Sequence, residues 1–424
     1  MENFLETIIQ DLLRLNIISE IKKTNCMKFL PILLAVLLSA NFSFSQTTFS
    51  HLQPGFHSQE ALDMIQLCNS YTYIDLYGYD KEILPKGYKK RYTSPVIGMD
   101  NMFQIYQKGN IGVINYRGST NKKVSWMENI NSAIIPAEGT IEIKGKTFNY
   151  KFANDTAAGV HSGYALGLAY LHEEILAQVK KLNNAGVYDI IITGHSQGGS
   201  LALLTRAYFE HLPNRKLSEK NSFKVYAFAQ PMIGNIELIK EYNAKFCKKE
   251  MSYSLINPAD MVPMMPLSYN DSSFWRSHLT ALISKDKEFD KSAMLKEGLT
   301  ILLQKKLQGT VEKFGESVTK QIEKELGEVT MPEPRKEINY AQVGNVIKLP
   351  PPEYPLELKD STILEDPVFL ADNPRDANGI FENKSVYKKT SVSQNHKPYN
   401  YYTAILKVYF PEKYDVVEPK LFGL

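Results

Sequence analysis

Neither the charged residues nor the metal-ligating residue types of this sequence are clustered enough to indicate a nucleic-acid or metal site. Its 49 basic and 46 acidic residues leave a net charge of only +3 and are spread along the whole chain. A nucleic-acid partner is not expected, because its binding requires a concentrated positive field. No His, Cys and carboxylate residues stand at metal-ligand spacing, so no metal is expected either. Internal repeats are also missing.

Cysteine is scarce as well. Of three cysteines, only Cys68 and Cys247 follow the first 45 residues. In an oxidising compartment the two are permitted to pair. Two buried free thiols are an equally good interpretation, because the sequence does not set the distance between the two Cα atoms. Pairing stays open at this stage.

Long charge-free apolar runs are missing after the N-terminal region. Residues 27–45, MKFLPILLAVLLSANFSFS, have a basic start, a short apolar core and small residues near the end, which is typical of a secretory signal peptide. No later segment has the roughly 18 charge-free residues of a transmembrane helix. We therefore expect residues 1–45 to be an extension plus signal, with the true start at Met1 or Met27. The mature protein is expected to be secreted or periplasmic.

What is present is enough apolar material for a large core. The chain is 43% hydrophobic, and turn-bounded apolar runs alternate with segments of helical period. This rhythm predicts an α/β fold with a mainly parallel central sheet flanked by helices. Residues 46–424 are expected to form one domain, with a helical insertion at about 270–335. Strands are predicted at 111–116, 188–193, 224–229, 251–256 and 340–349, a hairpin at 139–152, and a long helix at 158–182.

The chemical motif is G-x-S-x-G at the end of the predicted strand 188–193. Gly194 and Gly198 flank Ser196 in a turn that leads directly into a helix. Such a turn exposes the serine hydroxyl as a nucleophile, and glycines are required because side chains there would collide with neighbouring elements. The main-chain N–H of Gln197 would point to where an oxyanion forms. The alternative is a serine that merely turns the chain.

A serine nucleophile needs a base and a carboxylate that orients the base. In α/β-hydrolases these follow the serine in the order acid, then histidine. Asp260, just past the strand 251–256, is the best acid, although turn aspartates beside proline are common. His396, in a late polar loop, is favoured as the base over His278.

These residues resemble the class 3 lipases, the fungal-type triacylglycerol lipases of the α/β-hydrolase superfamily and their plant relatives. The similarity covers roughly residues 100–270, with short pieces near 340 and 396. The blocks are VINYRGST (113–120), VHSGY (160–164), ITGHSQGG (192–199), YAFAQPMIGN (226–235), INPADMVP (256–263) and YAQVG (340–344). In two respects the chain differs from the family: Gln197 replaces an apolar residue, and the gap from Asp260 to His396 is longer.

The resemblance implies roles for individual residues. Ser196 would be the nucleophile, Asp260 the acid and His396 the base, with the N–H groups of Ser119 and Gln197 forming the oxyanion hole. Trp126 falls where the family has its amphipathic lid. An ordinary core-facing helix is an equally good interpretation of that stretch, because Met127, Ile130 and Ile134 give it an apolar face.

We therefore expect a secreted serine esterase or lipase that cuts carboxylic esters of acylglycerols or phospholipids through an acyl-enzyme, without a cofactor. Transient contact with a membrane or lipid surface is a possible partner interaction. A carbohydrate-linked esterase, of feruloyl or acetyl type, and an inactive surface-binding scaffold are the alternatives. The inserted helices are expected to buttress the core, with capping of the acyl groove and contact with a membrane surface as the alternatives. The sequence does not indicate the acyl chain length or the oligomeric state.

Overall fold

The structure, a computed structural model, describes residues 51–69, 85–120, 122–213, 215–266, 318–336, 339–351, 356, 358–376, 379–388 and 395–414. Contacts divide the chain into two units, Met1–Phe49 and Ser50–Leu424, and all described residues belong to the second. The predicted signal at 27–45, His278 and most of the predicted insertion lie outside the described residues.

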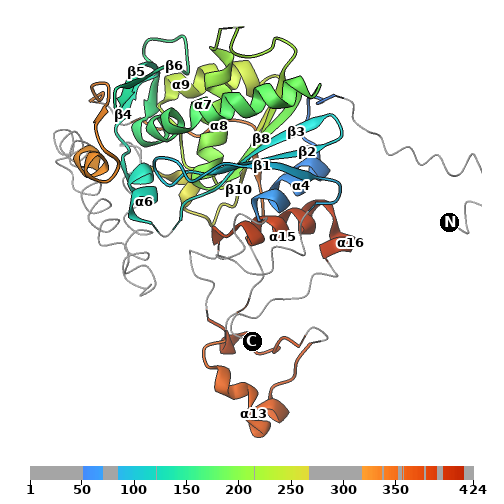
Figure 1. The fold of residues 1–424 in the computed structure, drawn as a ribbon. Helices are drawn as coiled ribbons and strands as arrows, with labels where there is room; N and C mark the ends of the chain where they lie inside the picture. The colour runs from blue at the N-terminus through green and yellow to red at the C-terminus, as the bar shows by residue number, and fades with distance from the viewer. Residues whose placement is uncertain are drawn as a thin grey trace, which may run out of the picture. The chain divides into compact units, whose positions relative to one another are not determined.

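A seven-stranded sheet forms the centre of the described part and confirms the predicted fold class (Figure 1). Every neighbouring pair from β3 to β12 is parallel, whereas β1 and β2 form an antiparallel edge. In spatial order the strands are β1 (Lys89–Thr93), β2 (Phe103–Lys108), β3 (Ile111–Tyr116), β8 (Asp189–His195), β9 (Ser222–Phe228), β10 (Ser252–Ile256) and β12 (Val346–Lys348).

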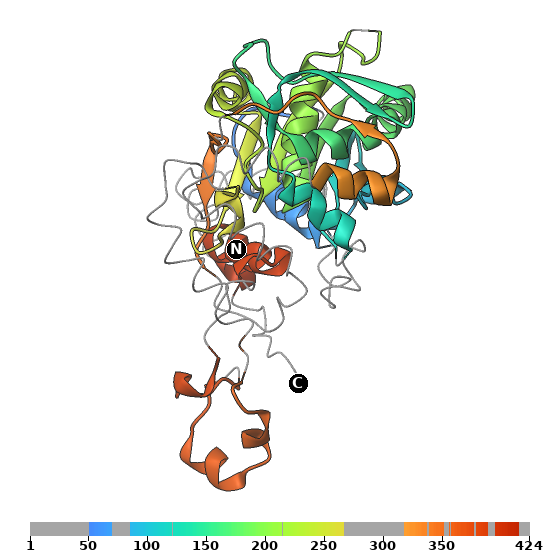
Figure 2. The same cartoon turned by 90° about the vertical axis from the view of Figure 1, so that its left-hand side faces the viewer.

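The central strands are apolar on both faces because helices cover both faces. Side chains alternate along a strand, so Ile190 and Ile192 pack in one core and Ile191 packs in the other. Helices α7 (Ser162–Asn184), α8 (Gln197–Glu210) and α9 (Ile236–Tyr242) contribute to the first core, and α4 (Ser58–Cys68) and α15 (Pro398–Tyr409) to the second. The side view in Figure 2 shows α4, in blue, beside α15, in red.

The long helix begins later than the sequence predicts. Residues Gly159–His161 form strand β7, which pairs antiparallel with β4 (Ile134–Pro136), and α7 starts at Ser162. The His161 side chain caps the helix, since its Nδ1 accepts a hydrogen bond from the Tyr164 N–H at 3.4 Å. A buried cap of this kind satisfies one of the free amides of the first turn.

A small antiparallel sheet lies beside the main one. The predicted hairpin is β5 (Glu138–Ile143) and β6 (Lys146–Lys151), with Lys144 and Gly145 both at positive φ in its two-residue turn. Strand β11 (Val329–Thr330) pairs with β5. Residues 318–326, at the end of the predicted insertion, are helical, and Val318 and Ile322 are buried in the first core. This part of the insertion therefore packs against the domain.

The remaining elements are short. They are α6 (Lys123–Ile130), the π-helical turn η3 (Asn243–Cys247), the 3-10 turns η4 (Val262–Met264), η6 (Ser361–Leu364) and η7 (Lys384–Val386), α13 (Pro367–Asp372) and α16 (Pro411–Tyr414). Between β12 and α15 the chain has a small apolar cluster of its own, built on Leu358, Ile380, Phe381 and Tyr387.

Both described cysteines are buried free thiols. The Cys68 Sγ donates to Asn115 Oδ1 at 3.5 Å, and the Cys247 Sγ donates to the Gly344 carbonyl at 3.5 Å. Burial raises the pKa of each thiol to about 12. The two residues therefore belong to different parts of the packing and do not pair.

Among the described helices, none combines the length and apolar character needed to cross a membrane.

Candidate active site

Ser196 stands at a sharp turn between β8 and α8. Its φ of 58° and ψ of −132° place it in a region that side-chain-bearing residues rarely occupy. A Cβ on Gly194 would overlap the backbone of Gly198, and a Cβ on Gly198 would lie 2.5 Å from the Tyr116 carbonyl oxygen. The two glycines are thus required by close backbone packing, which is the reason the motif has them.

His396 joins Ser196 to Asp260. Its Nε2 lies 2.8 Å from the Ser196 Oγ, and its Nδ1 lies 2.8 Å from the Asp260 Oδ2. Asp260 is 136 positions and Ser196 is 200 positions from His396 in the sequence. The structure therefore brings together the three side chains that the sequence selected, in the geometry of a nucleophile, a base and an orienting carboxylate.

Asp260 is held by more than the histidine. It is only 1% exposed, its Oδ2 also accepts from the Tyr401 hydroxyl at 2.8 Å, and its Oδ1 accepts from the Val262 N–H at 3.0 Å. Tyr401 in turn accepts from the Asn257 N–H at 3.0 Å. Burial and the nearby Asp260 hold the pKa of Tyr401 well above its usual range, so its hydroxyl remains a donor. Such donors suit an ionised carboxylate.

His396 has a second histidine beside it. The ring of His195 is centred 4.7 Å from the ring of His396. Burial, and then the proximity of His396, hold the pKa of His195 well below its usual range, so this neighbour stays neutral. Because the His396 side chain is 24% exposed while Asp260 is enclosed, the site opens to solvent on the side of the base.

The turn after β3 carries the other predicted oxyanion residue, Ser119. The Asn129 side-chain amide donates to the Ser119 Oγ at 2.8 Å, and Asn129 accepts from the Tyr164 hydroxyl at 3.0 Å. Gln197 is the first residue of α8, so its N–H has no carbonyl four residues back in the helix. Close contact of Gly198 with the Tyr116 and Arg117 carbonyls brings this turn against the start of α8.

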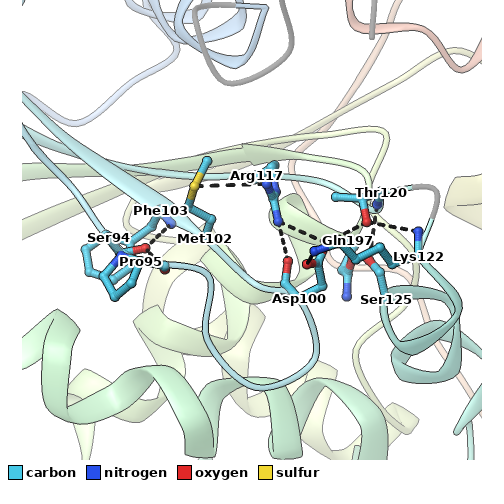
Figure 3. A network of polar contacts seen from close by, with 10 residues as sticks. All are labelled: Ser94, Pro95, Asp100, Met102, Phe103, Arg117, Thr120, Lys122, Ser125 and Gln197. Atoms are coloured by element: carbon cyan, nitrogen blue, oxygen red, sulfur yellow. Dashed lines mark hydrogen bonds and ion pairs between the residues drawn. The ribbon is translucent and has the colours of Figure 1, made fainter. Parts of the chain in front are cut away.

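An anchor that the sequence did not reveal holds the same turn. Asp100 accepts hydrogen bonds from Arg117 at 3.1 Å, from the Thr120 hydroxyl at 2.6 Å and from Lys122 at 2.7 Å (Figure 3). It is 4% exposed and has a φ of 63°. Nothing in its local sequence pattern marks it, because the partners lie 17 to 22 positions away.

Helix α6, the predicted location of a lid, packs its apolar side inward. Met127 is fully buried in the first core, and Val124 and Ile130 pack against that core. Trp126 is half-buried. This packing agrees with the core-facing interpretation of the stretch, and a lid function for Trp126 stays a prediction.

Sequence reasoning also missed Tyr401 and Glu128. Tyr401 follows the base by five residues within an apolar stretch, so its pattern indicates only a buried helix face. Glu128 is fully buried on α6, and burial raises its pKa to about 8 although the side chains of Gln197 and Asn101 lower it. Among the described residues, no group of three or more His, Cys, Asp or Glu could hold a metal ion.

The sequence model of the class 3 lipase family matches residues 113–270. A lipase of Caenorhabditis elegans is 33% identical over 87 residues, which are 20% of this chain and 23% of that protein. The secreted mono- and diacylglycerol lipase 1 of Fusarium solani is 24% identical over 141 residues, 31% of this chain and 39% of that protein. The chain thus spans less than half the length of both relatives.

Solved structures of fungal lipases are also similar. Lipase II from Rhizopus niveus is 19% identical with a TM-score of 0.37, over 50% of this chain and 75% of that one. The lipase from Rhizopus microsporus var. chinensis is 18% identical with a TM-score of 0.37, over 50% of this chain and 71% of that one.

Proposed function

We propose that this protein is a secreted serine hydrolase of lipid carboxylic esters. Its residues 113–270 match the class 3 lipase family. The observation that carries this proposal is His396, whose two ring nitrogens each lie 2.8 Å from their partner, Ser196 Oγ and Asp260 Oδ2. An unassisted serine hydroxyl is a poor nucleophile, and this contact supplies the base that it needs.

In the acylation step, Ser196 Oγ attacks the ester carbonyl while His396 Nε2 takes the hydroxyl proton. Asp260 holds the Nδ1–H tautomer and stabilises the imidazolium without itself taking the proton. The oxyanion is stabilised by the main-chain N–H groups of Ser119 and Gln197. Protonated His396 then gives its proton to the leaving alkoxide, and the alcohol departs.

In the second step, His396 takes a proton from water, and the resulting hydroxide attacks the acyl-enzyme. The tetrahedral intermediate collapses with return of the proton to Ser196 Oγ, which releases the acid and restores the enzyme. This two-step reaction needs no cofactor, because side chains transfer every proton and main-chain N–H groups stabilise the negative charge that develops.

Acylglycerols or phospholipids are the proposed substrates. The family assignment supports lipid esters, and the matched Fusarium protein is described as a secreted mono- and diacylglycerol lipase. Secretion is proposed from residues 27–45, whose pattern is typical of a signal peptide. Contact with a lipid surface during turnover is part of the same proposal.

The test is hydrolysis by the purified protein of triacylglycerol, diacylglycerol and phosphatidylcholine, beside p-nitrophenyl esters from acetyl to palmitoyl. We expect release of fatty acid that is abolished in Ser196→Ala and retained in Ser361→Ala, an exposed serine. If the protein cleaves only feruloylated or acetylated polysaccharide, its substrates are carbohydrate-linked esters and the proposal of lipid esters is wrong. An absence of activity on every ester, with no labelling of Ser196 by a fluorophosphonate, would favour the inactive scaffold.

Export is tested separately. The full chain, produced in a bacterial host, should appear outside the cytoplasm with an N-terminus after residue 45. A chain lacking residues 1–45 should remain inside. Retention of both forms in the cytoplasm would contradict secretion without affecting the ester chemistry.

A further inference from the structure

The residue after the nucleophile has a polar side chain that is fully enclosed. Gln197 is 2% exposed, and Ser125 and Glu128 of α6, which lie beside it, are 1% and 0% exposed. A buried polar side chain is costly unless other polar groups surround it. Its Oε1 accepts a hydrogen bond from Ser125, so its side chain connects the start of α8 to α6.

Ser125 links both sides of the proposed oxyanion site. Its hydroxyl donates to the Gln197 Oε1 at 3.3 Å and accepts from the Thr120 N–H at 3.1 Å (Figure 3). Thr120 directly follows Ser119, and its own hydroxyl is bound to Asp100. One serine therefore holds together the turn after β3 and the residue after the nucleophile.

Glu128 lies on the same side of α6 as Ser125, three residues later. Among the described residues neither of its carboxyl oxygens has a hydrogen-bond partner, although the Gln197 and Asn101 side chains lie near enough to lower its pKa. A Cβ on Gly163 would overlap the Glu128 carbonyl, and a Cβ on Gly167 would overlap its carboxyl group. Since α7 packs this tightly on Glu128, the carboxyl group cannot easily move away from Gln197.

We propose, resting on the proposed function, that Ser125 and Glu128 are positioning residues which hold the Gln197 main-chain N–H at the oxyanion site. Ser125 acts through its hydrogen bond to the Gln197 side chain, and the buried Glu128 acts by enclosing that side chain. An oxyanion donor acts only if it is fixed before charge develops. A displacement of about 1 Å in a catalytic group can lower the rate by about 100-fold. The apolar residue expected after the nucleophile could not be held through polar contacts of this kind.

The first test is Gln197→Leu, which keeps the main-chain donor and removes the side-chain contacts. With p-nitrophenyl butyrate we expect kcat to fall about 10- to 100-fold while KM changes less than twofold. Phenylboronic acid forms a tetrahedral adduct with Ser196, so its inhibition constant should rise by the same factor. An unchanged kcat, or a fall in kcat with unchanged boronate binding, would overturn the proposal.

The second test compares two variants of Glu128. Glu128→Gln keeps a polar group of the same shape and should retain activity within about threefold at pH 7, whereas Glu128→Leu should behave like Gln197→Leu. If Glu128→Leu fails to fold, Ser125→Ala serves in its place, since it removes the other contact to Gln197. Full activity in Glu128→Leu or Ser125→Ala would contradict the proposed role.

The pH profile separates positioning from a purely structural role. Burial raises the pKa of Glu128 to about 8, so wild-type kcat should fall above that pH as the carboxyl ionises and disturbs Gln197. This fall should be absent in Glu128→Gln. The titratable groups around this network are Tyr164 and His161 of the α7 start and, beyond Ser125, Asp100 with its partners Arg117 and Lys122. A fall retained in Glu128→Gln would show that ionisation of Glu128 does not cause it and would contradict this part of the proposal.

Controls keep this inference distinct from the proposed function. Lys123→Ala changes an exposed residue of α6 and should leave kcat, KM and boronate binding unchanged. Complete labelling by a fluorophosphonate counts folded, reactive Ser196 in every variant. Wild type that neither labels nor cleaves esters would refute the proposed function. Wild type that does both, with all network variants equally active, would refute only the positioning role.

Discussion

The two sides of the proposed active site are held in different ways. On the nucleophile side, which comprises Ser119, Ser196 and Gln197, backbones touch at Gly194 and Gly198 and leave no room for a side chain. On the acid–base side, which comprises Asp260 and His396, single hydrogen bonds join segments 136 residues apart. Close backbone contact fixes the elbow of the first side, to which polar contacts add, whereas the second side depends on a few polar contacts. Single substitutions should therefore act differently on the two.

The largest expected effect is on the acid–base side. His396→Ala should lower kcat by about 10⁵- to 10⁶-fold, because the serine loses its base. The double variant with Ser196→Ala should be no worse than either single one, since the two act as a unit. Steady-state kinetics on p-nitrophenyl butyrate measures both. Activity that survives in His396→Ala would move the base to another histidine, with His278 the first to test.

The close backbone contacts on the nucleophile side can be disturbed by added bulk. Gly198→Ala places a Cβ 2.5 Å from the Tyr116 carbonyl oxygen, so the elbow has to shift. We expect at least about a 100-fold loss of kcat and a loss of about 2 kcal/mol in the free energy of unfolding. Gly145→Ala is the matched control: it also sits at a tight turn, but a Cβ there meets nothing within 4 Å. It should lose stability without losing activity, and equal kinetics in both variants would contradict the steric account.

Tyr401→Phe sharpens the comparison by removing one hydroxyl. Asp260 loses a donor at 2.8 Å and the Asn257 N–H loses its acceptor, while the ring packing remains. We expect kcat to fall about tenfold, because a hydrogen bond to a charged group contributes about 1.5 to 3 kcal/mol and part of this is recovered by rearrangement. The neighbouring Tyr402→Phe should be neutral. A change confined to KM would argue against a role in orienting Asp260.

The last expected effect concerns the pH dependence of stability and belongs to the nucleophile side. Burial raises the pKa of Glu128 from 4.5 to about 8, so between these values the folded protein keeps a proton that the unfolded chain releases. The free energy of unfolding therefore falls as pH rises through this window, by at most about 1.4 kcal/mol per unit of pKa shift. Glu128→Gln should lack this contribution, so denaturant titrations at pH 5 and pH 8 should differ less in the variant. If the difference between pH 5 and pH 8 is the same in wild type and in Glu128→Gln, Glu128 is in contact with water and its pKa is not raised by burial.

The sequence predicted the parts of this molecule that are encoded locally. The strand at 111–116, the elbow at 194–198 and the hairpin at Gly145 follow from residue patterns within a few positions, because alternation and glycine placement act at short range. The order of acid and base along the chain selected Asp260 and His396, which the structure brings to Ser196.

The rest depends on contacts that no local pattern expresses. Strands β1 and β2, and helix α4, were not predicted, although β1, β2 and β3 pair in the order in which they follow one another along the chain. The start of α7 was misplaced because pairing of β7 with β4 overrides helical periodicity at 159–161. Asp100 and Glu128 look like surface carboxylates in the sequence, and only packing shows them to be buried.

The two buried thiols bear on how the protein can be produced. Cys68 and Cys247 are the only cysteines after residue 45, and each is a separate, enclosed thiol whose pKa burial raises to about 12. A thiol in this state reacts slowly with oxidants and alkylating reagents. Residues 46–424 therefore need no disulfide isomerase to mature, and a reducing bacterial cytoplasm is a suitable host for making them.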